Sequence, residues 1–65
     1  EAVRDELEAV EMAIELEQSA IAFYSGIKQI VRSSEQDVVE EIIAEEHRHI
    51  RRLLQLKDAL QYQDD

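Results

Sequence analysis

Apolar residues recur at intervals of three and four along almost the whole of this chain, and no proline interrupts them. This spacing is typical of an amphipathic helix, because it keeps the apolar side chains on one face. The chain has 65 residues and a single glycine, a composition that suits long helices better than strands and tight turns. The sequence therefore predicts an all-α fold.

The periodic pattern predicts two helices, over residues 2–31 and 35–62. Residues 32–34 lack the pattern, and Ser33 or Ser34 is suited to cap the second helix. Such a short turn favours antiparallel helices, so residues 1–65 are expected to form a single helical hairpin. Gly26, within the first helix, indicates either a close contact between helices or a local kink.

Each helix carries more apolar surface than one helix–helix contact buries. In the first helix, one row consists of Val3, Leu7, Val10, Ile14, Glu17, Ile21, Tyr24, Lys28 and Val31. A neighbouring row consists of Ala9, Ala13, Leu16, Ala20, Phe23, Ile27 and Ile30. The central row of the second helix consists of Val39, Ile42, Glu46, His49, Leu53, Leu56 and Leu60. A hairpin of this size has no second layer, so we expect two copies to pair into an antiparallel four-helix bundle.

The charge of the chain restricts its partners. Sixteen acidic and seven basic residues give a formal net charge of −9, which argues against nucleic acid and anionic membrane surfaces. No apolar run approaches the roughly 20 residues of a membrane span. The absence of cysteine fits a reducing compartment, and we expect the cytoplasm. The start at Glu1, without an initiator methionine, suits a segment of a longer protein.

Three ionisable residues interrupt the apolar rows at core positions: Glu17, Glu46 and His49. Glu17 precedes the turn by about sixteen residues and the other two follow it by about twelve to sixteen, so all three lie at nearly one level. Two carboxylates and an imidazole at one level are ligands for iron, manganese or zinc. The alternative is that the carboxylates pair with His49 or Lys28 and no metal is present.

The segment EQSAIAFY, from Glu17 to Tyr24, and the later Glu46-His47-Arg48-His49 resemble the ferritin-like di-iron carboxylate proteins, in particular their rubrerythrin-like and encapsulated-ferritin branch. In that family one helix supplies a glutamate followed seven residues later by a tyrosine, and the next supplies Glu-x-x-His. The resemblance covers roughly residues 10–60. Single-chain members have four helices and two Glu-x-x-His motifs, whereas this chain has one.

The resemblance implies a ferroxidase-type metal site shared by two subunits. Two copies of Glu17, Glu46 and His49 would be both metal ligands and catalytic residues for two iron ions per dimer, with Mn or Zn as substitutes. Tyr24 would be a hydrogen-bond partner near the ligands. Fe(II) would be oxidised by dioxygen or peroxide for iron storage or detoxification, in a dimer or higher oligomer inside a shell protein. The alternative function is a non-catalytic helical-hairpin interaction module or a structural metal-binding dimer.

The other charged residues have simpler interpretations. His47 lies at the edge of the apolar face, where a boundary histidine is favoured over a further ligand. Glu45 flanks the other edge and is a candidate to orient the imidazole of His49. An acidic row is interpreted as a solvated face, with a cation-attracting approach to the site as the alternative. That row consists of Glu8, Glu11 and Glu15.

Overall fold

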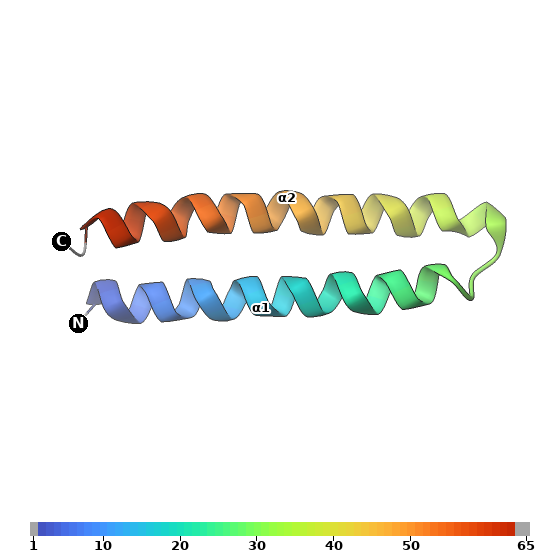
Figure 1. Cartoon of the computed structure of the whole chain (residues 1–65). Helices are drawn as coiled ribbons and strands as arrows, with labels where there is room; N and C mark the ends of the chain where they lie inside the picture. The colour runs from blue at the N-terminus through green and yellow to red at the C-terminus, as the bar shows by residue number, and fades with distance from the viewer. Residues whose placement is uncertain (1, 64–65) are drawn as a thin grey trace.

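The computed structural model describes residues 2–63, with side-chain surroundings for residues 4–62. Helix α1 spans Ala2–Lys28 and helix α2 spans Ser33–Gln63. The two helices run antiparallel and side by side, so that the start of α1 and the end of α2 lie at the same end (Figure 1). No strand occurs among residues 2–63. The predicted all-α class is therefore confirmed.

Helix α1 ends at Lys28, three residues before the predicted boundary. Its last turn is closed by short-range backbone hydrogen bonds. The amide of Gln29 donates to the carbonyl of Gly26 at 3.2 Å, and the amide of Ile30 donates to the carbonyl of Ile27 at 3.0 Å. Bonds across three residues wind the backbone more tightly than an α-helix and are common at helix ends. The chain therefore leaves the helix before the apolar spacing stops.

Helix α2 begins at Ser33, two residues before the predicted boundary. Ser33 and Ser34 lie inside its first turn, so neither occupies the capping position that precedes a helix. The amide of Glu35 donates instead to the carbonyl of Arg32 at 2.8 Å. The carboxylate of Glu35 also lies in this first turn, where the partial positive charge of the helix N-terminus favours an acidic residue.

Gly26 does not mark a close approach of the two helices. A Cβ atom added at this position would meet no neighbouring atom within 4 Å, and the backbone there has no positive φ. The close-contact interpretation of Gly26 is therefore wrong for the contact between α1 and α2, because Gly26 lies on an exposed face of α1.

The buried core lies toward the two ends of the hairpin and leaves the middle more open. Near the free helix ends, the core cluster comprises Val10, Ile14 and Leu60, with Leu7 and Leu53 packed against it. Val39 is buried near the turn. Val3, the first member of the predicted core row, lies outside the residues whose side chains are described. The Cα atoms extend over 49 × 14 × 11 Å, so the hairpin is one layer thick.

One side of the hairpin is polar. Successive residues of a helix are about 100° apart around its axis. The residue that follows a position facing the other helix therefore points to one side of the hairpin, and in two antiparallel helices this is the same side. On this side Lys28 forms an ion pair with Glu40, and Lys57 lies 3.4 Å from Glu11. A shallow groove there is lined by Ser25, Lys28, Gln29, Gln36, Glu40 and Ile43. Glu11 follows the buried Val10 and Glu40 follows the buried Val39, so both helices place residues that follow buried positions on this side.

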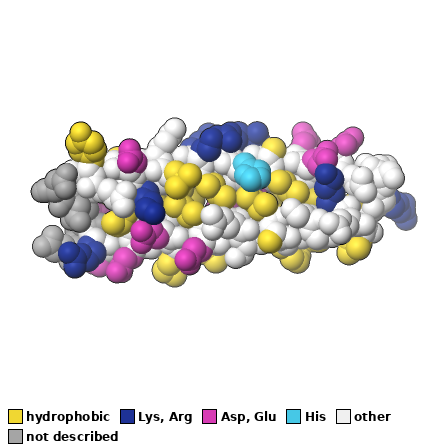
Figure 2. Space-filling view, in the orientation of Figure 1, with side chains coloured by type: hydrophobic (Ala, Val, Ile, Leu, Met, Phe, Trp, Pro, Cys, Tyr) yellow, Lys and Arg dark blue, Asp and Glu magenta, His cyan; other side chains and the backbone are white. Residues whose placement is uncertain are grey.

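The opposite side is apolar and uncovered. It carries the residues that precede the positions facing the other helix, and we call it the open face; it is formed by Leu16, Phe23, Ile30, Val38, Ile42 and Leu56. Leu56 was predicted in the central row of the second helix, but it is 48% exposed, so that part of the prediction is wrong. Leu16, Phe23 and Ile30 are 68%, 63% and 83% exposed. Figure 2 shows the other, polar side, where basic and acidic side chains lie beside each other over both helices and hydrophobic side chains lie between the helices. The large members of the predicted second apolar row, apart from the half-buried Ile27, are thus left in water by a single hairpin.

Neither helix contains an apolar stretch, within the described residues, that could cross a membrane.

Candidate metal centre

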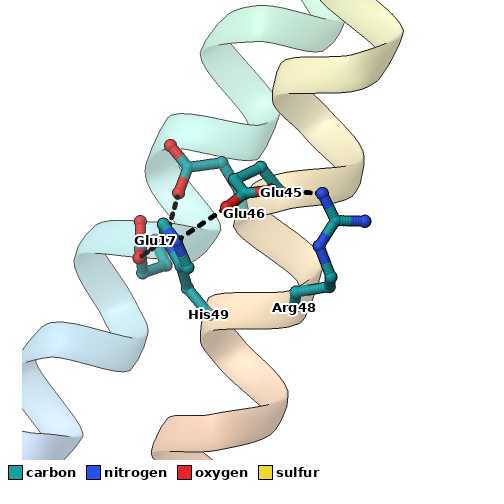
Figure 3. A network of polar contacts seen from close by, with 5 residues as sticks. All are labelled: Glu17, Glu45, Glu46, Arg48 and His49. Atoms are coloured by element: carbon teal, nitrogen blue, oxygen red, sulfur yellow. Dashed lines mark hydrogen bonds and ion pairs between the residues drawn. The ribbon is translucent and has the colours of Figure 1, made fainter.

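Glu17, Glu46 and His49 meet between the helices at the middle of the hairpin (Figure 3). One ligand atom from each of these residues lies within 4.8 Å of the others. Nδ1 of His49 is 3.0 Å from Oε2 of Glu17 and 3.3 Å from Oε1 of Glu46. The predicted proximity of the three residues is therefore confirmed, and their role as metal ligands stays a prediction.

The two helices fix the heights of these side chains independently. Glu17 lies one turn from Ile14, which belongs to the core cluster, and this packing sets its height along α1. Glu46 and His49 are three residues apart on α2, so their side chains leave the same face on consecutive turns. The three groups converge because the antiparallel pairing brings these two segments to the same level.

The site is half-buried and opens to one side. The side chains of Glu17 and Glu46 are 23% and 17% exposed, whereas that of His49 is 41% exposed. His49 precedes Ile50, a half-buried residue on the side of α2 that faces α1, so its ring lies toward the open face. The carboxylates thus form the inner wall of the site, and the imidazole forms its outer edge on the uncovered apolar side.

The two carboxylates influence each other's ionisation. Hydrogen bonding with Glu17 is the largest cause that raises the pKa of Glu46 above its ordinary value of 4.5, followed by partial desolvation and the like charge of Glu17. Contacts with His49 oppose this rise. Glu45 shows the opposite behaviour, because its hydrogen bond and charge interaction with Arg48 lower its pKa. The proximity of Glu17 and Glu46 therefore favours the binding of a positive charge between them, either a proton or a metal ion.

The raised pKa of Glu46 predicts how the stability of the metal-free protein depends on pH. A group whose pKa is higher in the folded state contributes stability that is complete below its unfolded pKa and is lost as the pH rises through its folded pKa. As the pH rises above about 4.5, we expect the free energy of unfolding of wild type to fall relative to that of Glu46→Gln, whose side chain cannot ionise. Urea titrations at several pH values measure this difference.

Glu41→Gln is the matched control for this measurement, because it removes the same charge at an exposed position of α2. Saturating zinc should reverse the trend, since the metal binds the deprotonated carboxylate. A wild-type profile that parallels that of Glu46→Gln would contradict the shift in the pKa of Glu46.

The donor set suits a first-row metal ion. Carboxylate oxygens and an imidazole nitrogen are ligands of iron, manganese and zinc, whereas calcium and magnesium are held by oxygen alone. The three side chains of one hairpin fill only part of the coordination sphere of one ion. A second set of the same residues would supply four carboxylates and two imidazoles, the number of protein ligands found in carboxylate-bridged di-metal sites.

The remaining sequence candidates lie outside this cluster. Tyr24 is half-buried and packs edge-to-face against Phe23, with ring centroids 5.4 Å apart. No side-chain hydrogen bond within residues 4–62 joins Tyr24 to the ligands, so its predicted contact with them is not seen in one hairpin. His47 is exposed, as a boundary residue would be. Lys28 pairs with Glu40, so the alternative in which Lys28 neutralises the inner carboxylates is wrong.

The acidic row lies at the surface, as expected of a solvated face. All three of its members are exposed; they are Glu8, Glu11 and Glu15. Glu11 lies 3.4 Å from Lys57 of α2, so part of its negative charge is offset within the hairpin. The row therefore contributes to the contact between the helices as well as to the net charge.

One contact near the site, between Arg48 and Glu45, was not predicted from the sequence. Nη2 of Arg48 donates a hydrogen bond to Oε1 of Glu45, and Oε2 of Glu45 lies 3.6 Å from Nε2 of His49. Figure 3 shows Glu45, Arg48 and His49 on α2, with Arg48 contacting Glu45 and with Glu17 projecting from α1 toward His49. The signal available in the sequence was the pair of opposite charges three residues apart.

Comparisons with family models, with curated proteins and with solved structures gave no match to this chain. The resemblance to ferritin-like proteins, carried by Glu17, Tyr24, Glu46 and His49, therefore stays a prediction.

Proposed function

We propose that this hairpin is one half of a di-iron protein that oxidises Fe(II) at a site shared by two subunits. The observation that carries this proposal is the convergence of Glu17, Glu46 and His49 in the middle of the hairpin, with one ligand atom of each within 4.8 Å of the others. The resemblance to ferritin-like proteins supports the same assignment, because it includes the same three residues.

A second copy is the partner that the surface of the hairpin favours. The open face carries exposed Leu16, Phe23 and Ile30, and the imidazole of His49 lies toward the same face. Covering this face buries the apolar row and brings a second set of ligands to the site in one step. Glu17 lies near the middle of α1 and His49 near the middle of α2, so a two-fold axis at their level superimposes the two half-sites.

The proposed reaction balances when two iron ions react together. Each Fe(II) loses one electron, and the two electrons with two protons reduce dioxygen to hydrogen peroxide or reduce peroxide to water. Glu17 and Glu46 hold the two cations close together and offset their charge, while His49 completes the ligand set and leaves positions for the oxidant. Manganese or zinc would occupy the same ligands, and zinc would not support the electron transfer.

The resemblance also extends to the setting of the reaction. Oxidised iron would be stored or kept from harmful chemistry, in a dimer or a larger oligomer of dimers, in the cytoplasm and within a shell protein. The net charge of −9 favours cations over nucleic acid or anionic membranes as ligands of this protein.

The test of the proposed function is an anaerobic titration with Fe(II), followed by light scattering and then by exposure to air or hydrogen peroxide. We expect a dimer that takes up about two Fe(II), as a paired carboxylate site does. Oxidation should then proceed faster than in buffer, as followed by the absorption of Fe(III). Glu41→Gln, which removes an exposed charge on α2, is the control and should behave as wild type.

Two results would contradict the proposal. A protein that remains a monomer with metal present cannot contain the shared site. A dimer that binds one metal ion, or that holds iron without speeding its oxidation, would be a structural metal site.

The direct contacts of His49 with both carboxylates favour one alternative. At 3.0 and 3.3 Å, Glu17 and Glu46 can pair with a protonated imidazole without a metal ion. The hairpin would then be a non-catalytic interaction module whose polar core fixes the register of the helices. Metal analysis of the purified protein distinguishes the two functions, because the module would contain no stoichiometric metal.

A further inference from the structure

The imidazole of His49 has carboxylates beside both of its nitrogens. Nδ1 faces Glu17 and Glu46, at 3.0 and 3.3 Å, and Nε2 lies 3.6 Å from Oε2 of Glu45. Glu45 precedes His49 by four residues, so the helix itself holds the two side chains on neighbouring turns. The other oxygen of Glu45 accepts a hydrogen bond from Arg48, which limits the rotation of the carboxylate.

We propose that Glu45 is a positioning residue that accepts the Nε2–H proton of His49 in a hydrogen bond and thereby presents Nδ1 to the metal. This inference rests on the proposed metal site. A neutral imidazole carries its proton on one nitrogen and offers a lone pair on the other. A carboxylate beside Nε2 favours the tautomer with the proton at that nitrogen, which leaves the lone pair of Nδ1 directed at Glu17 and Glu46.

Glu45 is the residue placed for this role, because the opposite tautomer competes with metal binding. With a proton on Nδ1, His49 donates a hydrogen bond to Glu17 across 3.0 Å and occupies the oxygen that the metal needs. Glu45 draws the proton to the other side of the ring. The present separation of 3.6 Å is longer than a hydrogen bond, and a small side-chain rotation closes it to one.

The predicted second copy would strengthen this contact. Glu45 precedes the inward-facing Glu46, so it lies on the same side of the hairpin as the open face. Its side chain is 55% exposed in a single hairpin, where water screens the interaction with His49. Covering the open face excludes part of this water, and the hydrogen bond becomes stronger in the less polar surroundings.

Arg48 acts one step further from the metal. Its guanidinium contacts Glu45 and makes no ion pair with Glu17, Glu46 or His49 within residues 4–62. Removing Arg48 frees the carboxylate without removing the acceptor. We therefore expect a smaller effect for Arg48→Ala than for Glu45→Ala, and no further loss in the double variant beyond that of Glu45→Ala, because both changes interrupt the same interaction.

The experiment uses zinc as a diamagnetic probe and nitrogen NMR of the imidazole. His47→Gln leaves His49 as the single histidine of the chain and removes ambiguity from the spectrum. In zinc-loaded protein labelled with 15N-histidine, we expect Nδ1 to carry the metal and Nε2 to carry a slowly exchanging proton. Zinc affinity is measured in parallel by competition with a chromophoric chelator.

Glu45→Ala should weaken zinc binding by about 10-fold, at the lower end of the range for residues that support a ligand, and should speed the exchange of the Nε2 proton. Glu45→Gln keeps a neutral acceptor and should restore the slow exchange and part of the affinity. Glu41→Ala, an exposed change one turn earlier in α2, is the matched control and should alter neither. Circular dichroism should show the same helix content in all variants, because Glu45 is largely exposed.

Two outcomes would overturn the positioning role alone: zinc bound through Nε2 in wild type, or wild-type affinity and proton exchange in Glu45→Ala. A wild-type protein that binds no zinc would overturn the proposed metal site as well, so the two failures are distinguishable.

Discussion

His49→Ala should lose nearly all of the iron-oxidising activity while keeping the helical hairpin. In the proposed dimer, the substitution removes one of three predicted ligands per subunit, so each iron ion would lose its nitrogen donor. Residues that only support a ligand typically change metal affinity or activity by about 10- to 100-fold. Loss of the ligand itself should therefore lower the oxidation rate by at least about 100-fold. Stopped-flow absorption of Fe(III), measured at equal iron and protein concentrations, gives this rate.

The fold should survive this change because the imidazole is 41% exposed and no buried cavity is created. Alanine also has a higher helix propensity than histidine. His47→Ala is the matched control: it removes an exposed imidazole two residues away and should leave the rate unchanged. Equal losses in the two variants would show that the effect is not that of a ligand, and a wild-type rate in His49→Ala would contradict the ferroxidase assignment.

The two helices could be predicted because apolar spacing is a property of the whole segment. Their ends could not be predicted as well, because they depend on single hydrogen bonds. The bonds from Gln29 to Gly26 and from Ile30 to Ile27 end α1 three residues early, and nothing in the apolar pattern at Ile30 signals them. Gly26 was misjudged for a related reason: a sequence reveals a missing side chain, but not whether a neighbour approaches it.

The proximity of Glu17 and His49 could be predicted because it depends only on the number of residues between each of them and the turn. The midpoint of positions 17 and 49 is position 33, (17 + 49)/2, which lies where the turn was expected. An equal rise per residue in both helices then places Glu17 and His49 at one level, whatever the conformation of the turn. The shift of both helix ends toward the N-terminus did not alter this level, because core packing and not the turn sets the alignment.

Contacts at the rim of the site were beyond prediction because they depend on side-chain rotamers. The pair of Arg48 and Glu45 is exposed, and exposed ion pairs contribute little energy and are weakly specified by sequence. The prediction for Tyr24 had a different origin. Its predicted contact with the ligands came from the resemblance, and in the hairpin its ring instead packs against Phe23 on the side of the open face.

Glu46→Leu should make the metal-free protein more stable and, at the same time, abolish metal binding. Metal-free wild type holds two carboxylates beside each other, and this proximity raises the pKa of Glu46. Leucine removes the repulsion and the cost of partial desolvation, and it leaves His49 paired with Glu17 at 3.0 Å. We expect the melting temperature of the metal-free protein to rise by on the order of 5 °C.

Added metal should reverse the order of the two proteins. A ligand that binds only the folded state at 100 times its dissociation constant stabilises it by about 2.7 kcal/mol, and Glu46→Leu would forgo this gain because its site has lost a predicted carboxylate ligand. Wild type should therefore melt below the variant without zinc and above it with zinc, as measured by calorimetry. Glu41→Leu, which adds the same side chain at an exposed position of α2, should show no crossing. A leucine variant that melts below wild type in the absence of metal would mean that Glu46 contributes more as a partner of His49 than it costs beside Glu17, and the site would then be a structural ion pair.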